Sequence, residues 1–408
     1  MKYKVGVVGL GKLGTPLALL IAEAGHVVHG VDLDSKRVEE LKSRNVADSE
    51  PGVQELLRDS SLNIDFSTDF DGLSCADVIY VIVPTPSLES GYFSNEFVIS
   101  ALDRISLAIS NSAAEQTVVI VSTVMPGSTG TVLREALQAN VAIESRAKKK
   151  IIYSPEFIAL GSVIHNLQFP DIILVGTEDG GNAESHLEIC KSMSKNSPEV
   201  KLLSIEEAEL VKLAINTFIT MKITFANFIG EIARNSIAID ASKVCEAIGK
   251  DSRIGTKYLS PGLGFGGPCF PRDNRAFSEY SKTLNLSADL AVGTERINKS
   301  LPRSISKWIR NKYTDDKKIA ILGITYKENT EVVEESQSIL LANELVDLGF
   351  KVMVHDPLLL VKPSLLNDKV KFSNDLESIY ECNLAIKTIN WPPYEKIDLQ
   401  LIDVIKMK

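Results

Sequence analysis

The chain has 408 residues, of which 44% are apolar and 24% charged, the composition of a soluble globular protein large enough for two or three domains. Its net charge of −9 and its lack of a long basic run argue against nucleic acid as a partner. No apolar run approaches the ~18 residues of a membrane helix. Glycines interrupt the apolar start of the chain, so we expect neither a signal peptide nor a membrane partner.

The cysteines are few and scattered, and no C-x-x-C spacing links any two of them. This pattern indicates no disulfide framework and no metal site, and it favours a reducing cytoplasm. The five are Cys75, Cys190, Cys245, Cys269 and Cys382.

The first half of the chain alternates short apolar runs with amphipathic segments. This alternation predicts an α/β fold whose mainly parallel sheet carries helices on both faces. The predicted buried strands are 4–9, 26–33, 77–83, 117–123, 150–154 and 171–176.

A glycine motif follows the first predicted strand directly. Gly9-x-Gly11-x-x-Gly14 precedes a helical pattern, and Asp32 ends the next strand. The glycines allow a tight turn and let a pyrophosphate approach the amides of a helix N-terminus. Asp32 would accept hydrogen bonds from ribose hydroxyls and repel a 2′-phosphate, which favours NAD over NADP. The alternative is that the glycines merely permit close packing.

Two further strands are followed by loops that contain proline, "VPTPS" (83–87) and "STVMPGST" (122–129). Ligands bind at the carboxyl ends of strands in such sheets. Two loops of this kind at neighbouring strand ends favour cofactor contacts over simple proline-shaped turns.

A carboxylate and a lysine–asparagine pair are candidate catalytic residues. Glu156, in "SPEF", follows a strand in an apolar setting that can raise a carboxyl pKa and produce a base. A solvated loop carboxylate is the alternative. Lys212 and Asn216 share one face of a long helix. Apolar neighbours favour a lysine that faces a polar cleft, and an ion pair with Glu209 is the alternative.

The pattern changes near residue 204. Ser204 and Glu207 form a capping box, and the helix predicted after it, over 206–237, is apolar on most sides. Such a helix must be buried between partners, so we predict the spine of a helical middle domain and a homodimer interface. A second helical stretch is predicted near 286–312.

The segment "GFGGPCFPRD" (264–273) sets a cysteine in a stiff loop. Its glycines permit close approach of a ligand, and Pro268 and Pro271 fix φ on either side of Cys269. A cysteine on such a loop is a candidate nucleophile. A small buried packing residue is the alternative.

The α/β pattern returns after the helical region, with strands predicted at 317–323 and 351–357 around a helix in 334–349. We therefore predict two Rossmann-like domains, 1–203 and 301–408, joined by a helical domain over 204–300. A cleft between such domains is the usual place for a substrate.

The order of G-x-G-x-x-G, "STV", "SPEF", "EAELVKLAINTF", "RIGTKYL", "GFGGPCFPRD" and "YKENT" resembles the nucleotide-sugar dehydrogenases, the UDP-glucose/GDP-mannose dehydrogenase family, over nearly the whole chain. The resemblance implies that the first domain binds NAD, the middle domain dimerises and the last domain holds the sugar nucleotide. It implies an NAD-dependent, four-electron oxidation of a C6 hydroxyl to a carboxylate through a cysteine thiohemiacetal and thioester. The family also serves polysaccharide biosynthesis.

The resemblance carries site roles onto residues of this chain by position. The implied catalytic residues are Cys269 as nucleophile, Lys212 and Asn216 as oxyanion donors, Glu156 as the base for hydrolysis, and Thr123 and Asp273 as water-placing groups. The predicted cofactor contacts are Gly9, Leu10, Gly11, Lys12, Leu13, Gly14, Asp32, Arg37, Thr85, Pro86, Ser122 and Thr123. The predicted substrate contacts are Glu156, Phe157, Lys212, Asn216, Arg253 (across the dimer interface), Tyr258, Gly264, Phe265, Gly266, Tyr326 and Lys327.

Three positions depart from the family pattern. Leu160 replaces an acid, Glu334 replaces an arginine expected near the cofactor, and the tail offers no obvious substrate-contacting arginine. Phe157 follows the pattern of the UDP-glucose and GDP-mannose branches, since branches acting on N-acetylated sugars usually carry arginine there. UDP-glucose is therefore the first choice of substrate, with another UDP-hexose, a UDP-N-acetylhexosamine or GDP-mannose as alternatives.

Two functions of other classes also fit parts of the sequence. A two-electron hydroxyacid dehydrogenase combines a Rossmann domain with a helical one and uses a lysine, but it has no need of Cys269. A non-catalytic, NAD-binding regulatory module would have no need of the catalytic set.

Overall fold

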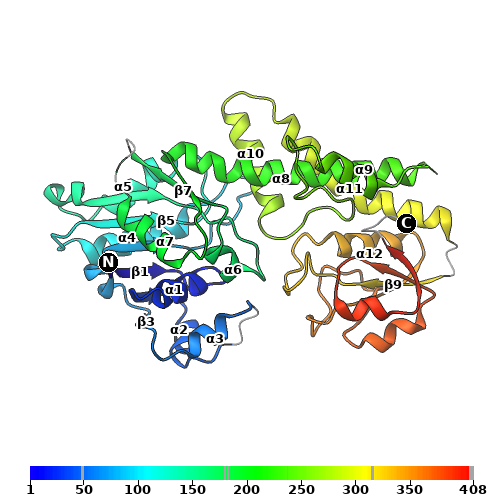
Figure 1. Ribbon diagram of the computed structural model, residues 1–408, viewed down its shortest axis with the longest axis horizontal. Helices are drawn as coiled ribbons and strands as arrows, with labels where there is room; N and C mark the ends of the chain where they lie inside the picture. The colour runs from blue at the N-terminus through cyan, green and yellow to red at the C-terminus, as the bar shows by residue number, and fades with distance from the viewer. Residues whose placement is uncertain (47–49, 179–180, 182, 237, 314–316, 404–408) are drawn as a thin grey trace. The chain divides into compact units, whose positions relative to one another are not determined.

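The computed structural model describes residues 1–46, 50–178, 181, 183–236, 238–313 and 317–403. The chain forms two compact units, Met1–Leu213 and Ala214–Lys408. Figure 1 follows the chain from blue to red and labels its main elements.

The first unit is built on an eight-stranded sheet of described residues, ordered β3-β2-β1-β4-β5-β6-β7-β8. Neighbouring strands run parallel except for β6 and β7, which are antiparallel. The strands are β1 Lys4–Val8, β2 Val27–Val31, β3 Ile64–Ser67, β4 Val78–Val81, β5 Gln116–Ile120, β6 Lys149–Tyr153, β7 Ile172–Thr177 and β8 Glu199–Ser204. The predicted mainly parallel sheet is confirmed, with β3 and β8 in addition.

Helices cover both faces of this sheet, as the prediction required. One apolar core contains side chains of α1 Gly14–Glu23, α2 Ser35–Lys42, α3 Val53–Arg58, α6 Val163–Gln168 and α7 Glu184–Met193. The other contains side chains of α4 Glu96–Ile109 and α5 Arg134–Gln138. Because both faces are covered, the central strands are apolar on both sides.

Helix α8, Ile205–Arg234, begins at the predicted capping box. The Ser204 amide donates to Glu207 Oε2 at 2.9 Å, and the Glu207 amide donates to Ser204 Oγ at 3.3 Å. The helix ends before the predicted residue 237, which lies outside the described residues. Among the described helices, α8 alone is long and apolar enough to cross a membrane, a test that the core helix of a soluble protein also passes.

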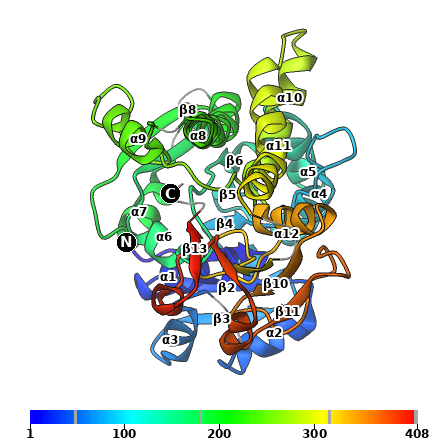
Figure 2. The ribbon, with the colours of Figure 1, turned by 90° about the vertical axis from the view of Figure 1, so that its right-hand side faces the viewer.

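The second unit joins helices to a smaller parallel sheet, ordered β11-β10-β9-β12-β13 among the described residues. Figure 2 shows β10, β11 and β13 of this sheet in orange to red. The strands are β9 Lys318–Leu322, β10 Lys351–His355, β11 Lys371–Ser373, β12 Leu384–Lys387 and β13 Gln400–Asp403. The helices are α9 Ala241–Gly249, α10 Phe270–Thr283, α11 Asp289–Lys312 and α12 Gln337–Asp347. The α/β fold class is thus confirmed, and the division into three domains stays a prediction.

Candidate active site

The glycine loop between β1 and α1 has room for a ligand at one position. A Cβ atom on Gly9 would lie 2.1 Å from the carbonyl oxygen of Ile82, and one on Gly14 would lie 1.8 Å from that of Gly9. Packing therefore requires these two glycines. A Cβ atom on Gly11 would meet no described atom within 4 Å, so its backbone faces open space that a pyrophosphate can approach.

A cavity of about 500 Å³ opens beside this loop at the carboxyl ends of β1 and β2. Its walls are mostly apolar, with the Asp32 carboxylate on one side, which fits the adenosine part of NAD. The lining includes the predicted Gly9, Gly11, Lys12, Leu13, Gly14 and Asp32, together with Leu33, Phe70, Pro84, Phe97 and Arg104. Pro84 belongs to the predicted loop 83–87, whereas sequence reasoning missed the other four, which come from separate elements that no motif connects.

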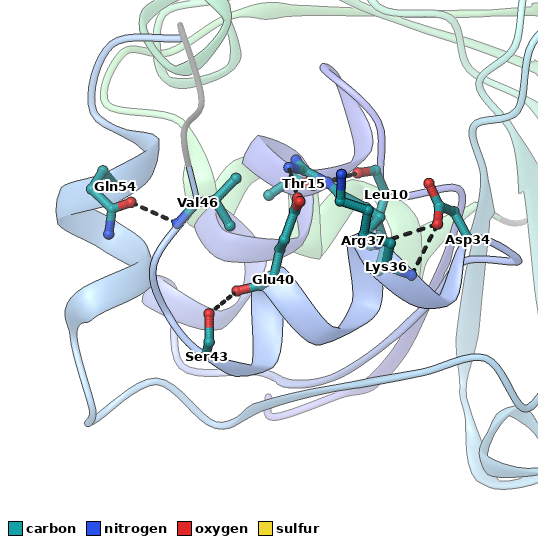
Figure 3. Close-up of polar contacts among 9 residues, drawn as sticks. All are labelled: Leu10, Thr15, Asp34, Lys36, Arg37, Glu40, Ser43, Val46 and Gln54. Carbon is teal, nitrogen blue, oxygen red and sulfur yellow. Dashed lines mark hydrogen bonds and ion pairs between the residues drawn. The ribbon is translucent and has the colours of Figure 1, made fainter.

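Asp32, which follows β2, together with Thr15 of α1 and Arg37 of α2, braces the glycine loop. The Leu10 amide donates to Asp32 Oδ2 at 2.7 Å, and the Leu10 carbonyl accepts from Thr15 Oγ1 at 2.7 Å and from Arg37 Nε at 3.0 Å. Figure 3 shows Arg37 directed at Leu10 and Thr15, while Asp34 caps α2. The guanidinium therefore supports the loop, and its predicted contact with the cofactor stays a prediction.

The two proline-containing loops at the ends of β4 and β5 are joined by hydroxyl groups. Thr85 Oγ1 donates to the Thr123 carbonyl at 2.7 Å. Ser122 Oγ accepts from the Val83 amide at 2.9 Å and donates to the Val83 carbonyl at 2.7 Å. These hydrogen bonds connect the two loops, so they are not two independent turns. Pro86, in the first loop, is exposed. Their contacts with the cofactor stay a prediction.

Glu156 has the ionisation expected of a base. Burial raises its pKa to about 7, although the positive charge of Lys212 acts in the opposite direction. The side chain keeps partial access to solvent, so a water molecule can reach it. Lys212 Nζ donates to the Glu156 carbonyl at 2.7 Å and lies 4.9 Å from the ring centroid of Phe157.

Glu209 has a structural role that the sequence did not reveal. Its buried carboxylate accepts from the Gly127 amide at 2.6 Å and from the Thr129 amide at 2.8 Å. It thereby fastens the loop after β5 to α8, one turn before Lys212. Both carboxylate oxygens of Glu209 thus accept hydrogen bonds from backbone amides. For Lys212, the structure gives a hydrogen bond to the Glu156 carbonyl.

Cys269 stands at the start of α10, in whose first turn the buried Asp273 carboxylate pairs with the Asn216 amide of α8. Asn216 Nδ2 donates to Asp273 Oδ2 at 2.6 Å, and the Asp273 amide donates to the Cys269 carbonyl at 2.8 Å. The thiol-bearing residue is exposed and is the N-cap of α10, where the helix dipole favours negative charge. Its exposure argues against the packing alternative.

The glycine-rich loop before Cys269 is held by two other segments of the second unit. Asn298 accepts from the Phe265 amide at 2.8 Å and donates to its carbonyl at 2.9 Å. The Gly267 amide donates to the Glu334 carbonyl at 2.9 Å, and a Cβ atom on Gly266 would lie 2.4 Å from the Glu335 carbonyl oxygen. We call residues 334–336 the strap, because this segment crosses the loop in direct contact.

An ionic network supports the strap. Arg275 of α10 forms ion pairs with Glu335 and with Glu295 of α11. Glu335 has a φ of +50°, a left-handed conformation that is uncommon for residues other than glycine. Glu334, which departs from the family pattern, uses its carbonyl on the loop and keeps an exposed side chain.

The other predicted substrate residues also have contacts within their own unit. Arg253 forms a two-point ion pair with Asp251, at 2.9 and 2.6 Å, and stays highly exposed. The Tyr258 ring meets Phe270 edge to face. The Tyr326 ring packs on Gly267 and lies 5.9 Å from Lys327 Nζ, and a Cβ atom on Gly264 would lie 2.0 Å from Asn298 Oδ1. Leu160 packs on the core of the first unit.

The predicted site residues thus form two groups, one in each unit. The first unit brings Lys212 to Glu156 and Phe157, and joins the loops of Thr85 and Thr123. The second unit brings together Asn216, Asp273, the Cys269 loop and Tyr326. The roles of all these residues stay predictions.

Comparisons with known proteins cover the whole chain. Models of the UDP-glucose/GDP-mannose dehydrogenase family match residues 3–194 (NAD binding domain), 206–300 (central domain) and 320–407 (UDP binding domain). A UDP-glucose 6-dehydrogenase of Haloferax volcanii is 28% identical, over 97% of this chain and 93% of that protein. A GDP-mannose 6-dehydrogenase of Pseudomonas savastanoi is 27% identical, over 86% and 80%. The structure of a UDP-glucose dehydrogenase from Pyrobaculum islandicum has a TM-score of 0.90 and 30% identity, over 100% and 95%.

Proposed function

The chain belongs to the UDP-glucose/GDP-mannose dehydrogenase family of NAD-dependent nucleotide-sugar dehydrogenases, and from this premise we propose that it oxidises UDP-glucose to the uronic acid with Cys269 as nucleophile. The observation that carries the proposal is the exposed Cys269 at the start of α10, with Asp273 and Asn216 bonded beside it. We place the reaction in the cytoplasm, where the product serves polysaccharide biosynthesis.

The chemistry needs a nucleophile because an aldehyde has no hydride to release until it becomes tetrahedral. The first oxidation removes a hydride and a proton from the C6 alcohol and leaves an aldehyde. The Cys269 thiolate then adds to C6 and forms a C–S bond, and Lys212 and Asn216 donate to the oxyanion. Loss of the hydroxyl proton and of a hydride from C6 of the thiohemiacetal then gives a thioester. NAD, when bound, accepts the hydride released in each oxidation.

Hydrolysis completes the reaction. Water adds to the thioester carbonyl, the C–S bond breaks, and the electron pair returns to the Cys269 sulfur as thiolate. Glu156 takes the proton from the attacking water, a role that its pKa of about 7 supports because the base form is well populated at neutral pH. Oxygen from water balances the carboxylate, and the four electrons leave as two hydrides.

The choice of substrate rests on Phe157 and on relatives. Phe157 follows the UDP-glucose and GDP-mannose pattern, and its ring lies under the Lys212 ammonium group. The match to the UDP-glucose 6-dehydrogenase of Haloferax volcanii covers 97% of this chain, against 86% for the GDP-mannose 6-dehydrogenase of Pseudomonas savastanoi.

We also propose a homodimer formed through α8. Phe218, Phe225, Phe228 and Ile232 follow the three- and four-residue spacing of one helix face and are between 42% and 58% exposed. Exposed apolar side chains in such a row favour a second copy of the helix as their partner. Arg253 would then reach the substrate of the partner subunit.

A screen of NADH release across UDP- and GDP-sugars tests the function. We expect turnover with UDP-glucose, about two NADH per sugar and no free aldehyde, because Cys269 captures the aldehyde as a thiohemiacetal. One NADH per substrate with a ketone product would instead indicate a two-electron hydroxyacid dehydrogenase. NAD binding without turnover on any sugar nucleotide would contradict the proposal.

A further inference from the structure

A buried chain of hydrogen bonds ends two residues before Glu156. The Tyr80 hydroxyl lies 3.0 Å from His186 Nδ1, and His186 Nε2 lies 2.9 Å from Ser154 Oγ. Ser154 Oγ in turn donates to the Leu174 carbonyl at 2.8 Å. The three side chains are at most 4% exposed, and they link β4, α7 and the end of β6.

The direction of every proton in this chain follows from its last bond. Ser154 gives its single proton to the Leu174 carbonyl, so its oxygen must accept from the N–H of His186 Nε2. His186 Nδ1 is then the lone pair that accepts from Tyr80. Burial lowers the His186 pKa to about 4, so the ring stays neutral in this single tautomer at physiological pH.

The chain ties the end of β6 to β7, the side on which the strand pairs least, whereas on the other side β6 pairs along β5 and the Ser154 amide donates to the Ile120 carbonyl at 2.9 Å. In the described part of the chain, the antiparallel β6–β7 ladder consists of one residue pair, Tyr153 with Gly176. The Ser154 hydroxyl therefore adds a tie from the end of β6 to β7. Pro155 then fixes φ, and Lys212 Nζ holds the Glu156 carbonyl at 2.7 Å, so the backbone of Glu156 is restrained on both sides.

Glu156 lies near enough to this chain to act on it electrostatically. Burial chiefly, with the negative charge of Glu156 in addition, raises the pKa of the Cys190 thiol, which contacts the His186 ring. The same charge adds to burial in raising the pKa of Tyr80. The partly exposed carboxylate therefore lies near the buried chain.

We propose that the Tyr80–His186–Ser154 chain positions Glu156 for hydrolysis of the thioester. The inference rests on the proposed function, in which Glu156 is the base. Tyr80, His186 and Ser154 are positioning residues, because they act only through the segment that Glu156 follows.

Two variants break the chain at different points. Ser154→Ala removes both the acceptor of His186 and the tie to β7, whereas Tyr80→Phe removes one hydroxyl and keeps the ring. Ser192→Ala is the matched control, because Ser192 lies on the same helix α7 and its Oγ is 3.0 Å from Nε2 of another buried histidine, His26. The control removes the same kind of bond without touching the Glu156 segment.

The measurements separate positioning from stability. Each protein is mixed with UDP-glucose and NAD, the reaction is quenched with acid, and the adduct is measured by intact mass spectrometry. The pH profile of turnover and the melting temperature are recorded separately. We expect Ser154→Ala to hydrolyse the thioester about 10- to 100-fold more slowly, the loss typical of a misplaced catalytic group. The adduct should accumulate and the acid limb of the profile should shift. Tyr80→Phe should show a smaller loss in the same direction, and the control none.

The positioning role would be overturned if Ser154→Ala had a lower melting temperature but an unchanged hydrolysis rate and pH profile. If Ser154→Ala does not fold, Tyr80→Phe gives the same test. Glu156→Gln distinguishes this failure from that of the proposed function. If Glu156→Gln accumulates adduct while the chain variants do not, only the positioning role fails. If Glu156→Gln hydrolyses the thioester at the wild-type rate, the base role itself is wrong.

Discussion

At the scale of single residues, the first prediction concerns Cys269, the proposed nucleophile. Cys269→Ser should keep the fold and NAD binding but disable turnover, because a hydroxyl is a much weaker nucleophile than a thiolate at neutral pH. A slowly formed ester would hydrolyse more slowly than a thioester, so intact-protein mass spectrometry should detect a substrate-sized adduct. Cys269→Ala should show neither adduct nor turnover, and since the residue is exposed its stability should change by no more than about 0.5 kcal/mol.

Full activity of the alanine variant would contradict covalent catalysis. The exposure of Cys269 already makes a packing role hard to sustain, since a packing residue would be covered.

The pKa of Glu156 predicts a pH dependence with a definite sign. Burial raises this pKa to about 7, and only the deprotonated form is a base, so hydrolysis should fall about tenfold per unit well below pH 7. The raised pKa means that the folded protein favours the protonated form. Its stabilising contribution is therefore complete below the ordinary carboxyl pKa and is lost as the pH rises through about 7.

Denaturant unfolding of wild type and Glu156→Gln at several pH values checks the second half of this prediction. The neutral variant should become the more stable of the two above pH 7. Parallel pH dependence of the two proteins would show that the carboxyl group titrates normally.

Residue types made Glu156 and Cys269 candidates, but they did not give the hydrogen-bond partners of the site residues. "SPEF" and "GFGGPCFPRD" each left a bland alternative open, and the resemblance to the family gave both residues their predicted roles. The bonds of Glu209 to Gly127 and of Tyr80 to His186 join residues that are 82 and 106 positions apart. Periodicity reports only on neighbours within a helix turn or a strand pleat, so it carries no information on such contacts.

At the scale of elements, buried and regular segments were predictable and exposed or mixed ones were not. Strands β1 and β9 are apolar runs, whereas β8, "EVKLLS", is half charged or polar and largely exposed, so it gives no strand signal. The loop around Cys269 also ends earlier than its prolines indicated. Pro271 lies in the first turn of α10, where its missing amide has no hydrogen bond to lose.

Gly266 gives a prediction at this scale. A Cβ atom there would press on the backbone of the strap, 2.4 Å from the Glu335 carbonyl oxygen, so Gly266→Ala should destabilise the protein by about 1–3 kcal/mol. Gly293→Ala is the matched control in α11, where the added Cβ atom meets nothing within 4 Å. It should stabilise the protein by about 0.5–1 kcal/mol through helix propensity.

Denaturant unfolding measures both changes, and alkylation of Cys269 by iodoacetamide, followed by peptide mass spectrometry, reports on the loop. Equal stability of the two variants would mean that the strap yields without cost.

For the whole molecule, the apolar row on α8 predicts the state of association. Phe225→Glu combined with Phe228→Glu should convert a dimer to a monomer, because each subunit would bring two charges into the interface. Leu107→Glu, at an exposed apolar position on α4, is the control and should leave the mass unchanged. Light scattering at working concentration gives the result. A stable and active wild-type monomer would refute the dimer.

The strap limits how residues 301–408 can be exchanged between relatives to make chimeric proteins. A protein engineer who exchanged residues 301–408 for those of a relative, in order to change the nucleotide accepted, would also replace the backbone that closes over the cysteine loop. The Gly267 amide donates to the Glu334 carbonyl, and the Tyr326 ring packs on Gly267. The cysteine loop and the segment after β9 therefore pack directly against each other. Chimeras should therefore retain activity only where the foreign segment reproduces the strap. On the proposed function, we therefore expect an exchange of residues 301–408 to change specificity and reactivity together.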